Sequence, residues 1–532
     1  MTERIQTLLL LLGVLVLVAV AAERRRQPPS ILLVVAGIAV ALVPGLPRYE
    51  LAPEFVLLVV LPPLIYSAGV AMSWREFRFN LRPIALLAVG GVIFSTVAVA
   101  AAMHELLGMP WAVAFVLGAI VAPPDVVAPL AIARGLRIPR RIVVVLEGEG
   151  LANDATALLL YRFAVAAVAT GVFSLPEAAG EFALIVVGEV TYGLAVGWTL
   201  LRVRRWARNP RVEVTLSLMT PYLAYWAPAH LGGSGVLATV TAGLYVSWTG
   251  PLLISAATRL QGIFFWDLVI YLVEGLVFLF TGLQMRTVVE RIHEDDLPRV
   301  LVAIAITTLV LIAARFAWVF PATYLPRWLS KSLARRDPAP PWRAPFVIAF
   351  TGVRGVVSLA AALAIPLATA AGTAFPYRDM ILFVTFGVIV VTLVGQGVAL
   401  PVLLRRLGLA QGAVEERRRE REAELAVRLE ALAVAERRLD ALAAERNLHE
   451  DVVGQLQARA VNRTRMLPRE LTDDLALTPA SAAVVSELID EERRFVVQML
   501  RDGRITDEAR RRIERELDLE EETIASKGEL RR

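Results

Sequence analysis

About thirteen long apolar runs recur along residues 1–410, and no other feature limits the possible folds so strongly. Their centres lie near residues 14, 38, 62, 93, 121, 154, 191, 219, 241, 272, 309, 357 and 391. A helix needs roughly 20 apolar residues to cross the hydrocarbon core of a bilayer, where every backbone polar group has to find its partner within the protein. The sequence therefore predicts an all-α polytopic membrane protein, in keeping with a hydrophobic share of 57%.

Positive charge in the loops predicts the orientation of the chain. Arginine and lysine gather after alternate runs, at residues 24–26, 75–82, 134–141, 202–211, 327–343 and 405–406. Because these side chains favour the cytoplasmic side, we expect the N-terminus outside and the C-terminus inside. The 24–26 cluster follows the first run, so that run is predicted to be a retained span. The alternative is a cleaved signal peptide, since small residues precede the end of the run.

Composition excludes thiol chemistry and argues against metal chemistry. The chain has no cysteine, and its four histidines lack the paired spacing of metal ligands on a helix. We therefore expect no cofactor, no transition metal and no catalytic residue. A distant alternative is an intramembrane protease, because HLGGSGVLAT places Ser234 in a G-x-S-G pattern; His230 lies too near in sequence to serve it and His104 lies near a membrane edge.

After residue 410 the composition changes to charged, leucine-spaced segments such as EAELAVRLEALAVAERRLDALAAER. This pattern is typical of an amphipathic or coiled-coil helix, so residues 411–532 are predicted to form a cytoplasmic helical domain. A second helical block is expected over residues 481–521, with Thr506 and Asp507 as its N-cap. The domain is interpreted as a helical bundle that helps dimerisation, and a ligand-sensing module is the alternative.

Six charged side chains lie within the predicted spans: Asp125, Glu147, Glu149, Asp154, Arg315 and Arg354. At roughly 2.5 to 3.5 kcal/mol each, they would cost on the order of 15 kcal/mol if they were unpaired and faced lipid. They are therefore expected to face the bundle interior. In LEGEGLANDATALLLYR, residues 146–162, Glu149 and Asn153 are four apart and Glu147 and Asp154 seven apart, which puts most polar groups on one helix face.

Two of the predicted spans are interrupted. In GAIVAPPDVVAP the consecutive Pro123 and Pro124 should break the helix and free backbone carbonyls beside Asp125, a suitable place for a hard cation. In FTGVRGVVSLAAALAIP two glycines bracket Arg354. These are the fifth and twelfth runs of thirteen, so they run in opposite directions. A pair of broken helices at corresponding positions indicates an inverted-repeat secondary transporter; the alternative is two kinks that serve packing alone.

Several segments together carry a resemblance to a known family. EGEGLANDATALLLYR resembles the E-S-L-x-N-D-A/G-T motif, and GAIVAPPDVVAP the broken S/T-D-P helix, of NhaP-like sodium/proton exchangers of the monovalent cation:proton antiporter-1 family. LPPLIYSAG, LVFLFTGLQ, ARFAWVFP and GVRGVVSLAAALAIP follow in the family order. The resemblance implies a plasma-membrane homodimer (the bacterial inner membrane). Core spans over about residues 82–168 and 298–406 would move against dimerisation spans that make up the remainder of 1–410.

The resemblance also implies roles for single residues. Asp154 would bind Na⁺ or H⁺ alternately and Asn153 would support it, while Arg354 would offset the dipoles of its own broken helix. Glu149 would pair with Arg315 as a structural ion pair. The remaining implied ion-binding positions belong to the unwound stretch of the fifth span: Ala122, Pro124 and Asp125.

Two departures from the family pattern affect the ion preference. Gly150 stands where many members have serine, and Ser67 stands where many have an acidic residue. With one titratable group at the site, we expect electroneutral exchange of one Na⁺ for one H⁺. A K⁺/H⁺ or Li⁺/H⁺ antiporter is the closest alternative and a cation channel a distant one. Four further acids receive no predicted role beyond interface or cavity: Glu189, Glu213, Asp267 and Glu274.

Overall fold

The computed structural model describes residues 2–25, 28–43, 52–127, 129–131, 138–289, 297–369, 372–446 and 451–455, with scattered positions from 489 to 517. Its contacts divide the chain into two compact units, Met1–Glu416 and Arg417–Arg532. Across these described residues the secondary structure is helical, apart from one isolated bridge between Ala368 and Ala374. The all-α prediction is confirmed for this part of the chain. The predicted second tail helix lies almost wholly outside the described residues.

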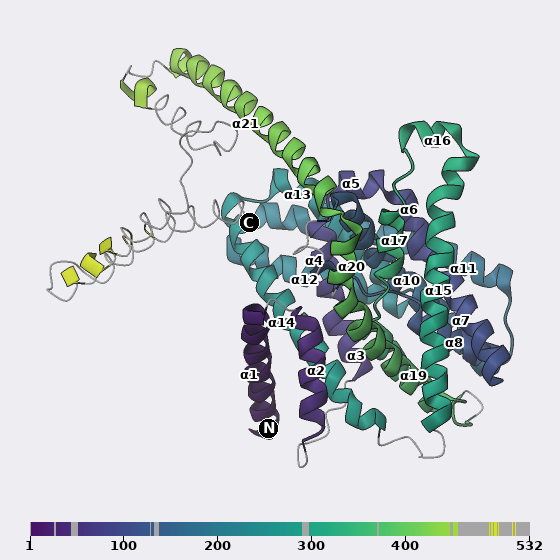
Figure 1. Cartoon of the computed structure of the whole chain (residues 1–532). Helices are drawn as coiled ribbons and strands as arrows, with labels where there is room; N and C mark the ends of the chain where they lie inside the picture. Colours follow the sequence, from purple (N-terminus) through teal and green to yellow (C-terminus); the bar gives the residue numbers. More distant parts are fainter. Residues whose placement is uncertain are drawn as a thin grey trace. The chain divides into compact units, whose positions relative to one another are not determined.

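The helices of the first unit are best given as one list (Figure 1). They are α1 (Thr2–Arg25), α2 (Pro29–Ala41), α3 (Pro53–Phe55), η1 (Val56–Val60), α4 (Leu61–Ala71), α5 (Trp74–Phe79), α6 (Leu81–Ala85), η2 (Leu86–Gly91), α7 (Val92–Leu107), α8 (Trp111–Val121), α10 (Arg140–Thr170), α11 (Leu175–Ala207), α12 (Pro210–His230), α13 (Val236–Leu253), α14 (Ala256–Val289), α15 (Leu297–Leu329), α16 (Lys331–Arg336), α17 (Arg343–Phe350), α18 (Val356–Leu363), α19 (Arg378–Val391), η4 (Thr392–Gln396) and α20 (Gly397–Leu407). Helix α21 (Ala410–Arg446) continues into the second unit.

Seven helical stretches in the described ranges are long and apolar enough to cross a membrane. They are Pro53–Ala71, Leu81–Leu107, Arg140–Thr170, Leu175–Ala207, Ala257–Thr287, Leu297–Leu329 and Arg378–Leu407. Helices α2 and α8 are apolar but shorter. These seven stretches confirm a multi-pass membrane protein. The count of thirteen spans, the inverted repeat and the orientation of the termini stay predictions.

Both predicted interruptions are present in the structure. Helix α8 ends at Val121, with only its C-cap Ala122 before the consecutive Pro123 and Pro124, because a proline nitrogen has no hydrogen to donate and its ring clashes with the preceding turn. Residues 351–355 are non-helical between α17 and α18. Each interruption leaves helix ends inside the protein, where their backbone groups need partners.

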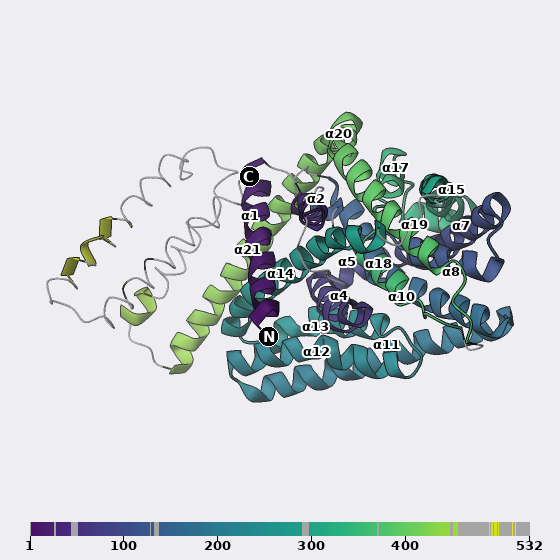
Figure 2. The same ribbon diagram turned by 90° about the horizontal axis from the view of Figure 1, so that it is seen from below.

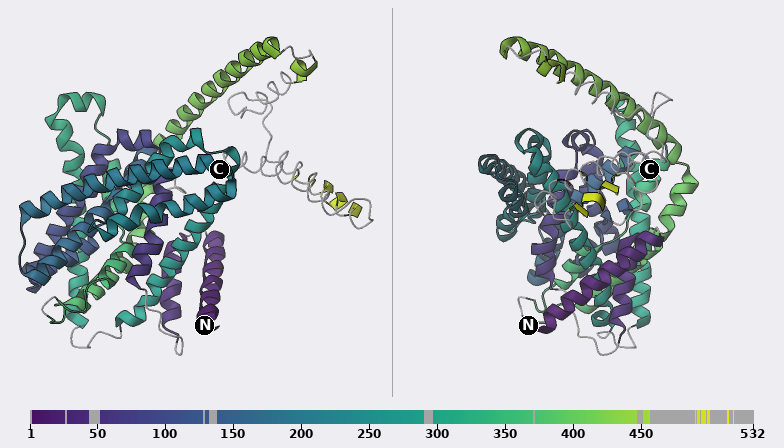
Figure 3. Two further views of the ribbon diagram at one scale, coloured as in Figure 1. Left: turned by 180° about the vertical axis from the view of Figure 1, so that it is seen from behind. Right: turned by 90° about the vertical axis from the view of Figure 1, so that its left-hand side faces the viewer.

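Close glycine contacts hold one side of the first unit together. A Cβ atom on Gly282 of α14 would lie 2.8 Å from the Gly37 Cα of α2, and one on Gly243 of α13 would lie 3.1 Å from the Gly69 Cα of α4. Small residues let membrane helices approach backbone to backbone. Figure 2 shows α11, α12 and α13 gathered on one side, with α7, α15, α17 and α19 on the other, and Figure 3 shows the long blue-green helices α11 and α12 side by side.

Helix α10 runs through the middle of this unit. It contacts α8, η2 and α13, and residues along its length from Val144 to Ala164 belong to the largest buried apolar cluster. Its glycines allow the tight fit, because a Cβ on Gly148 would collide with the Ile84 side chain of α6. The polar face of α10 is therefore enclosed by other helices.

Candidate functional site

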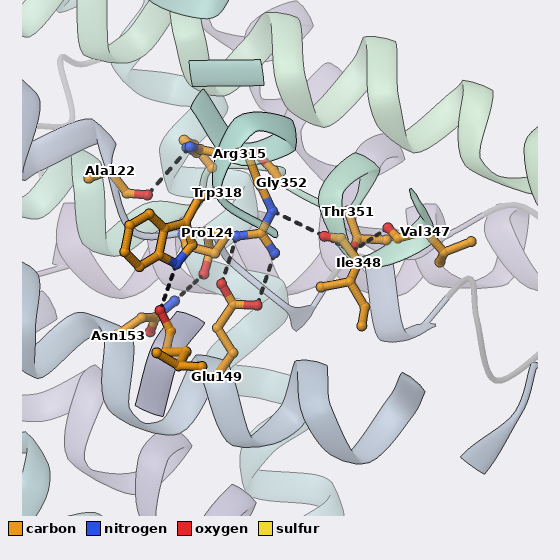
Figure 4. A network of polar contacts seen from close by, with 12 residues as sticks. Ala122, Pro124, Glu149, Asn153, Arg315, Trp318, Val347, Ile348, Thr351 and Gly352 are labelled. Atoms are coloured by element: carbon orange, nitrogen blue, oxygen red, sulfur yellow. Dashed lines mark hydrogen bonds and ion pairs between the residues drawn. The ribbon is translucent and has the colours of Figure 1, made fainter. Parts of the chain in front are cut away.

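A buried ion pair lies on the polar face of α10. Glu149, whose side chain is 1% exposed, accepts two hydrogen bonds from Arg315 of α15, at 2.6 Å from Nη1 and 2.9 Å from Nη2 (Figure 4). The Arg315 Nε also donates to the Ile348 carbonyl, at 3.1 Å, near the C-terminal end of α17. One guanidinium thus links α10, α15 and the first half of the second broken helix, in the bidentate geometry that favours arginine over lysine.

The two broken helices meet through backbone and side-chain contacts. The Asp125 N–H donates to the Val353 carbonyl at 2.7 Å, and the Arg354 N–H donates to the Thr392 hydroxyl at 3.1 Å. The guanidinium of Arg354 donates to the Val121 carbonyl at 2.7 Å and also to the carbonyls of Ala122 and Gly352. Arg354 therefore sits at the C-terminal end of α8, the other broken helix, as well as against its own segment. Positive charge is favourable at a helix C-terminus.

Asp125, in turn, lies against the second broken helix. Its Oδ1 accepts from the Val127 N–H at 2.9 Å, and a Cβ atom on Gly355 would collide with its Oδ2. Gly355 is the N-cap of α18, so the carboxylate of the first broken helix lies at the N-terminus of the second. Negative charge is favourable there. The crossing thus places one charge at each of two facing helix ends.

Asn153 joins α10 to the same crossing. Its Nδ2 donates to the Pro124 carbonyl at 2.7 Å, and the residue is completely buried. Its Oδ1 is buried without a hydrogen-bond partner among the residues that the structure describes. An orphaned buried carbonyl oxygen is costly, so this atom is positioned to receive a ligand or a water molecule.

Asp154, the next residue, differs from the other two acids. It is half-buried, and no hydrogen bond or ion pair ties its carboxylate to any residue that the structure describes. Glu149 is fully engaged by Arg315, and Asp125 is held by the Val127 N–H and the end of α18. Among these three carboxylates, Asp154 alone is uncommitted. The described residues contain no group of three or more His, Cys, Asp or Glu side chains that could hold a metal ion.

Two positioning contacts are absent from the sequence prediction. The indole Nε1 of Trp318 on α15 donates to the Leu86 carbonyl at 2.8 Å, within the π-helical turn η2, and a Cβ on Gly90 would collide with the same indole. Thr392 begins another π-helical turn, η4, and receives the Arg354 N–H. Such turns often occur in functional regions, but no sequence pattern predicts them. The available signal was an indole N–H inside a span, which needs an acceptor.

Glu189, one of the acids without a predicted role, caps a helix. Its carboxylate accepts from the backbone N–H groups of Gly235 at 2.9 Å and Leu237 at 3.0 Å, at the start of α13. The Ser234 hydroxyl donates to the same carboxylate at 3.0 Å, and His230 Nδ1 lies 2.8 Å from the Trp226 carbonyl. Ser234 and His230 are therefore each engaged elsewhere, so the G-x-S-G stretch is a helix N-terminus with a buried counter-charge.

Asp337, in the connection between α16 and α17, gathers three arginines. Arg82 of α6, Arg141 of α10 and Arg327 of α15 each place a nitrogen 2.7 Å from its carboxylate. Partial burial would raise the pKa of Asp337, but the hydrogen bond and charge of Arg141, with the charges of Arg327 and Arg82, bring it below the usual value. One aspartate thus joins the ends of three helices, all within the predicted core spans.

Comparison with known proteins agrees with this arrangement. The model of the family described as "Sodium/hydrogen exchanger, transmembrane" matches residues 9–406. An uncharacterized Na⁺/H⁺ exchanger of Mycobacterium tuberculosis is 38% identical over 376 residues, which are 70% of this chain and 69% of that one. A Bacillus subtilis protein named as a sodium, potassium, lithium and rubidium/H⁺ antiporter is 35% identical over 386 residues, 70% of this chain and 57% of that one. The solved sodium proton antiporter MjNhaP1 of Methanocaldococcus jannaschii shares the fold, with a TM-score of 0.62 at 19% identity over 76% of this chain and 98% of that one.

Proposed function

Because this chain belongs to the sodium/hydrogen exchanger family, a family of transporters rather than enzymes, we propose that it exchanges Na⁺ for H⁺ across the plasma membrane by competition of the two ions for Asp154. The observation that carries the proposal is the uncommitted carboxylate of Asp154 beside two acids that are already engaged. A group that has to gain and lose an ion in each cycle cannot be held by a permanent partner.

The neighbours of Asp154 support this assignment. The Oδ1 of Asn153, which has no hydrogen-bond partner among the described residues, supplies a neutral oxygen on the residue directly before Asp154. Asp125, with the unwound stretch that contains Pro124 and Ala122, forms the other side of the proposed ion site. Glu149 and Arg315 pair with each other and hold α10 and α15 together, so both charges are already matched without the cation.

The coupling of Na⁺ transport to H⁺ transport follows from the cost of moving a bare carboxylate. The proton binds a carboxylate oxygen of Asp154 when the cation leaves, and the cation displaces it when it returns. A bare carboxylate is costly to move through the membrane core, so the site crosses only when it is occupied by one ion or the other. Asn153 cannot titrate, and Asp125 stays bound to the Val127 N–H beside the N-terminus of α18. We therefore propose that Asp154 alone exchanges its proton, one for each Na⁺ and without net charge movement. We expect a homodimer in which the core spans move and the remaining spans stay still, with the tail of residues 411–532 in the cytoplasm.

The first experiment measures proton movement in everted membrane vesicles from a host without its own antiporters. After acidification, added Na⁺ should alkalinise the vesicle interior with the wild-type protein, and Asp154→Asn should abolish the response. Asp379→Asn is the matched control, because its carboxylate is 60% exposed at the start of α19. Alkalinisation that survives in Asp154→Asn would end the proposal.

Stoichiometry needs a separate measurement. In proteoliposomes with equal ion concentrations on both sides, an imposed voltage should drive no steady transport current if the exchange is one for one. A sustained current under voltage alone would replace the electroneutral mechanism with an electrogenic one or with a channel.

The second candidate is K⁺/H⁺ or Li⁺/H⁺ exchange. It is favoured by the Bacillus subtilis relative, whose name includes potassium, lithium and rubidium. The same vesicle assay separates these candidates when each cation is added alone.

A further inference from the structure

Val126 fills a gap that Gly150 leaves on α10. A Cβ atom on Gly150 would collide with the Val126 Cγ2 and lie 3.0 Å from its Cγ1 and 3.3 Å from its Cβ. Gly150 stands one helical turn before Asp154, and Val126 directly follows Asp125 in the chain. The methyl groups of Val126 therefore lie between the segments that carry the two carboxylates of the site.

Four backbone oxygens of the crossing already have donors. The Pro124 carbonyl accepts from Asn153, the Val121 and Ala122 carbonyls accept from Arg354, and the Val353 carbonyl accepts from the Asp125 N–H. Among the side-chain oxygens of Asp125, Asn153 and Asp154, those without a donor in the described residues are the Asp154 carboxylate, the Asn153 Oδ1 and the Asp125 Oδ2. A cation at this place meets few free protein oxygens and has to keep part of its water.

We propose that Val126 is a specificity-determining residue: by filling the space beside Gly150 with methyl groups, it keeps a side-chain oxygen out of the site, so that K⁺ is accepted as well as Na⁺. This inference rests on the proposed function of Asp154. It concerns which cation the same carboxylate takes.

The physical reason is the balance between dehydration and coordination. Na⁺ is smaller than K⁺ and holds its water more tightly, so it gains more from each additional protein oxygen that replaces a water molecule. Selectivity between such ions depends on the number, field strength and rigidity of the ligands. A site with two carboxylates, one amide oxygen and retained water has a small number of protein ligands and an adaptable shape. It therefore discriminates weakly between the two ions.

Val126→Thr is the decisive variant, since threonine has the shape of valine with one methyl group replaced by a hydroxyl. Na⁺/H⁺ and K⁺/H⁺ exchange are measured in the vesicle assay over a range of cation concentrations, and the KM of each ion is compared. The wild type should exchange both ions with KM values within about tenfold of each other, since weak discrimination is worth no more than about 1.4 kcal/mol. Val126→Thr should raise the ratio of the K⁺ KM to the Na⁺ KM by about threefold or more, the worth of one added polar contact.

Val165→Thr is the matched control. It makes the same isosteric change further along α10, where the side chain packs against the largest buried apolar cluster instead of against Gly150. It should leave the KM ratio unchanged. A second variant, Gly150→Ser combined with Val126→Ala, brings the hydroxyl from α10 and removes the clashing methyl groups. It should shift the ratio in the same direction as Val126→Thr, and it serves if Val126→Thr does not reach the membrane.

The outcomes separate the two proposals. If the wild type shows no cation-dependent alkalinisation that Asp154→Asn removes, the proposed function fails. If it exchanges Na⁺ but not K⁺, or if both hydroxyl variants transport with an unchanged KM ratio, the function stands and the inference about Val126 is overturned.

Discussion

Removing one partner of the Glu149–Arg315 pair should destabilise the first unit strongly. The side chains are 1% and 8% exposed, and two hydrogen bonds of 2.6 and 2.9 Å join them. Breaking a buried pair by neutralising one member leaves the other charged and unpaired, at a cost of about 3–5 kcal/mol. Glu149→Gln and Arg315→Gln should each lower the free energy of unfolding by that amount.

The double variant distinguishes this reasoning from a simple loss of contacts. Glu149→Gln combined with Arg315→Gln buries no unpaired charge, so it should cost well below the sum of the two single changes. Arg315→Lys keeps the charge but loses the forked geometry and the bond to the Ile348 carbonyl, so it should fall between the wild type and Arg315→Gln.

The assay is reversible unfolding of the purified protein in mixed micelles titrated with a denaturing detergent. Arg140→Gln is the control, because its ion pair with Glu76 is 46% and 34% exposed and such a pair contributes about 0–1 kcal/mol. Additive losses in the double variant, or a loss in Arg140→Gln as large as that in Arg315→Gln, would refute the reasoning.

Three further predictions concern contacts away from the ion site. The pKa of Asp337 lies below its usual 3.8, so the stabilisation by its negative charge is complete above pH 3.8 and is lost only as the pH falls through the lower folded value. Asp337→Asn should therefore lower the apparent Tm equally at about pH 6 and about pH 9 in thermal unfolding. A loss that vanishes at pH 6 would contradict this. Glu189→Gln should cost about 1–3 kcal/mol, because the backbone donors at the start of α13 keep an acceptor but lose its charge, and unfolding in mixed micelles measures it; no change would show that the charge is immaterial. Gly90→Ala should reduce the amount of folded protein recovered by size-exclusion chromatography, and adding Trp318→Phe should restore part of it because the smaller ring clears the collision; a double variant as poor as Gly90→Ala would argue against this contact.

The polar face of α10 and the two helix breaks could be predicted because both depend on local rules. Charged residues repeat at helical spacing around Glu149 and Asp154, and proline cannot continue a helix at Pro123. Lipid adds a strong constraint, since charges within a span have to turn inward. Local spacing and the cost of burial therefore carry most of the information about where the site lies.

The partners across the crossing depend instead on which helix ends meet in space. Arg354 was expected to act on its own broken helix, yet it also donates to the Val121 and Ala122 carbonyls of α8, because the crossing brings the C-terminal end of that helix nearest. The groups that donate hydrogen bonds to Glu189 lie 45 to 49 residues away in sequence, and one that donates to Asp337 lies 255 residues away. The π-helical turn beside Trp318 has no sequence pattern at all. Pairings of this kind are set by tertiary contact.

The separation of Glu149 and Arg315 along the chain has a consequence for biosynthesis. The two residues are 166 positions apart, and at about 5–20 residues per second the ribosome needs roughly 8–33 s to reach Arg315 after it has made Glu149. Helix α10 therefore enters the membrane with a carboxyl group whose counter-charge does not yet exist. The newly made first half has to shelter that group until α15 arrives, so final assembly of the ion site waits for the second half of translation.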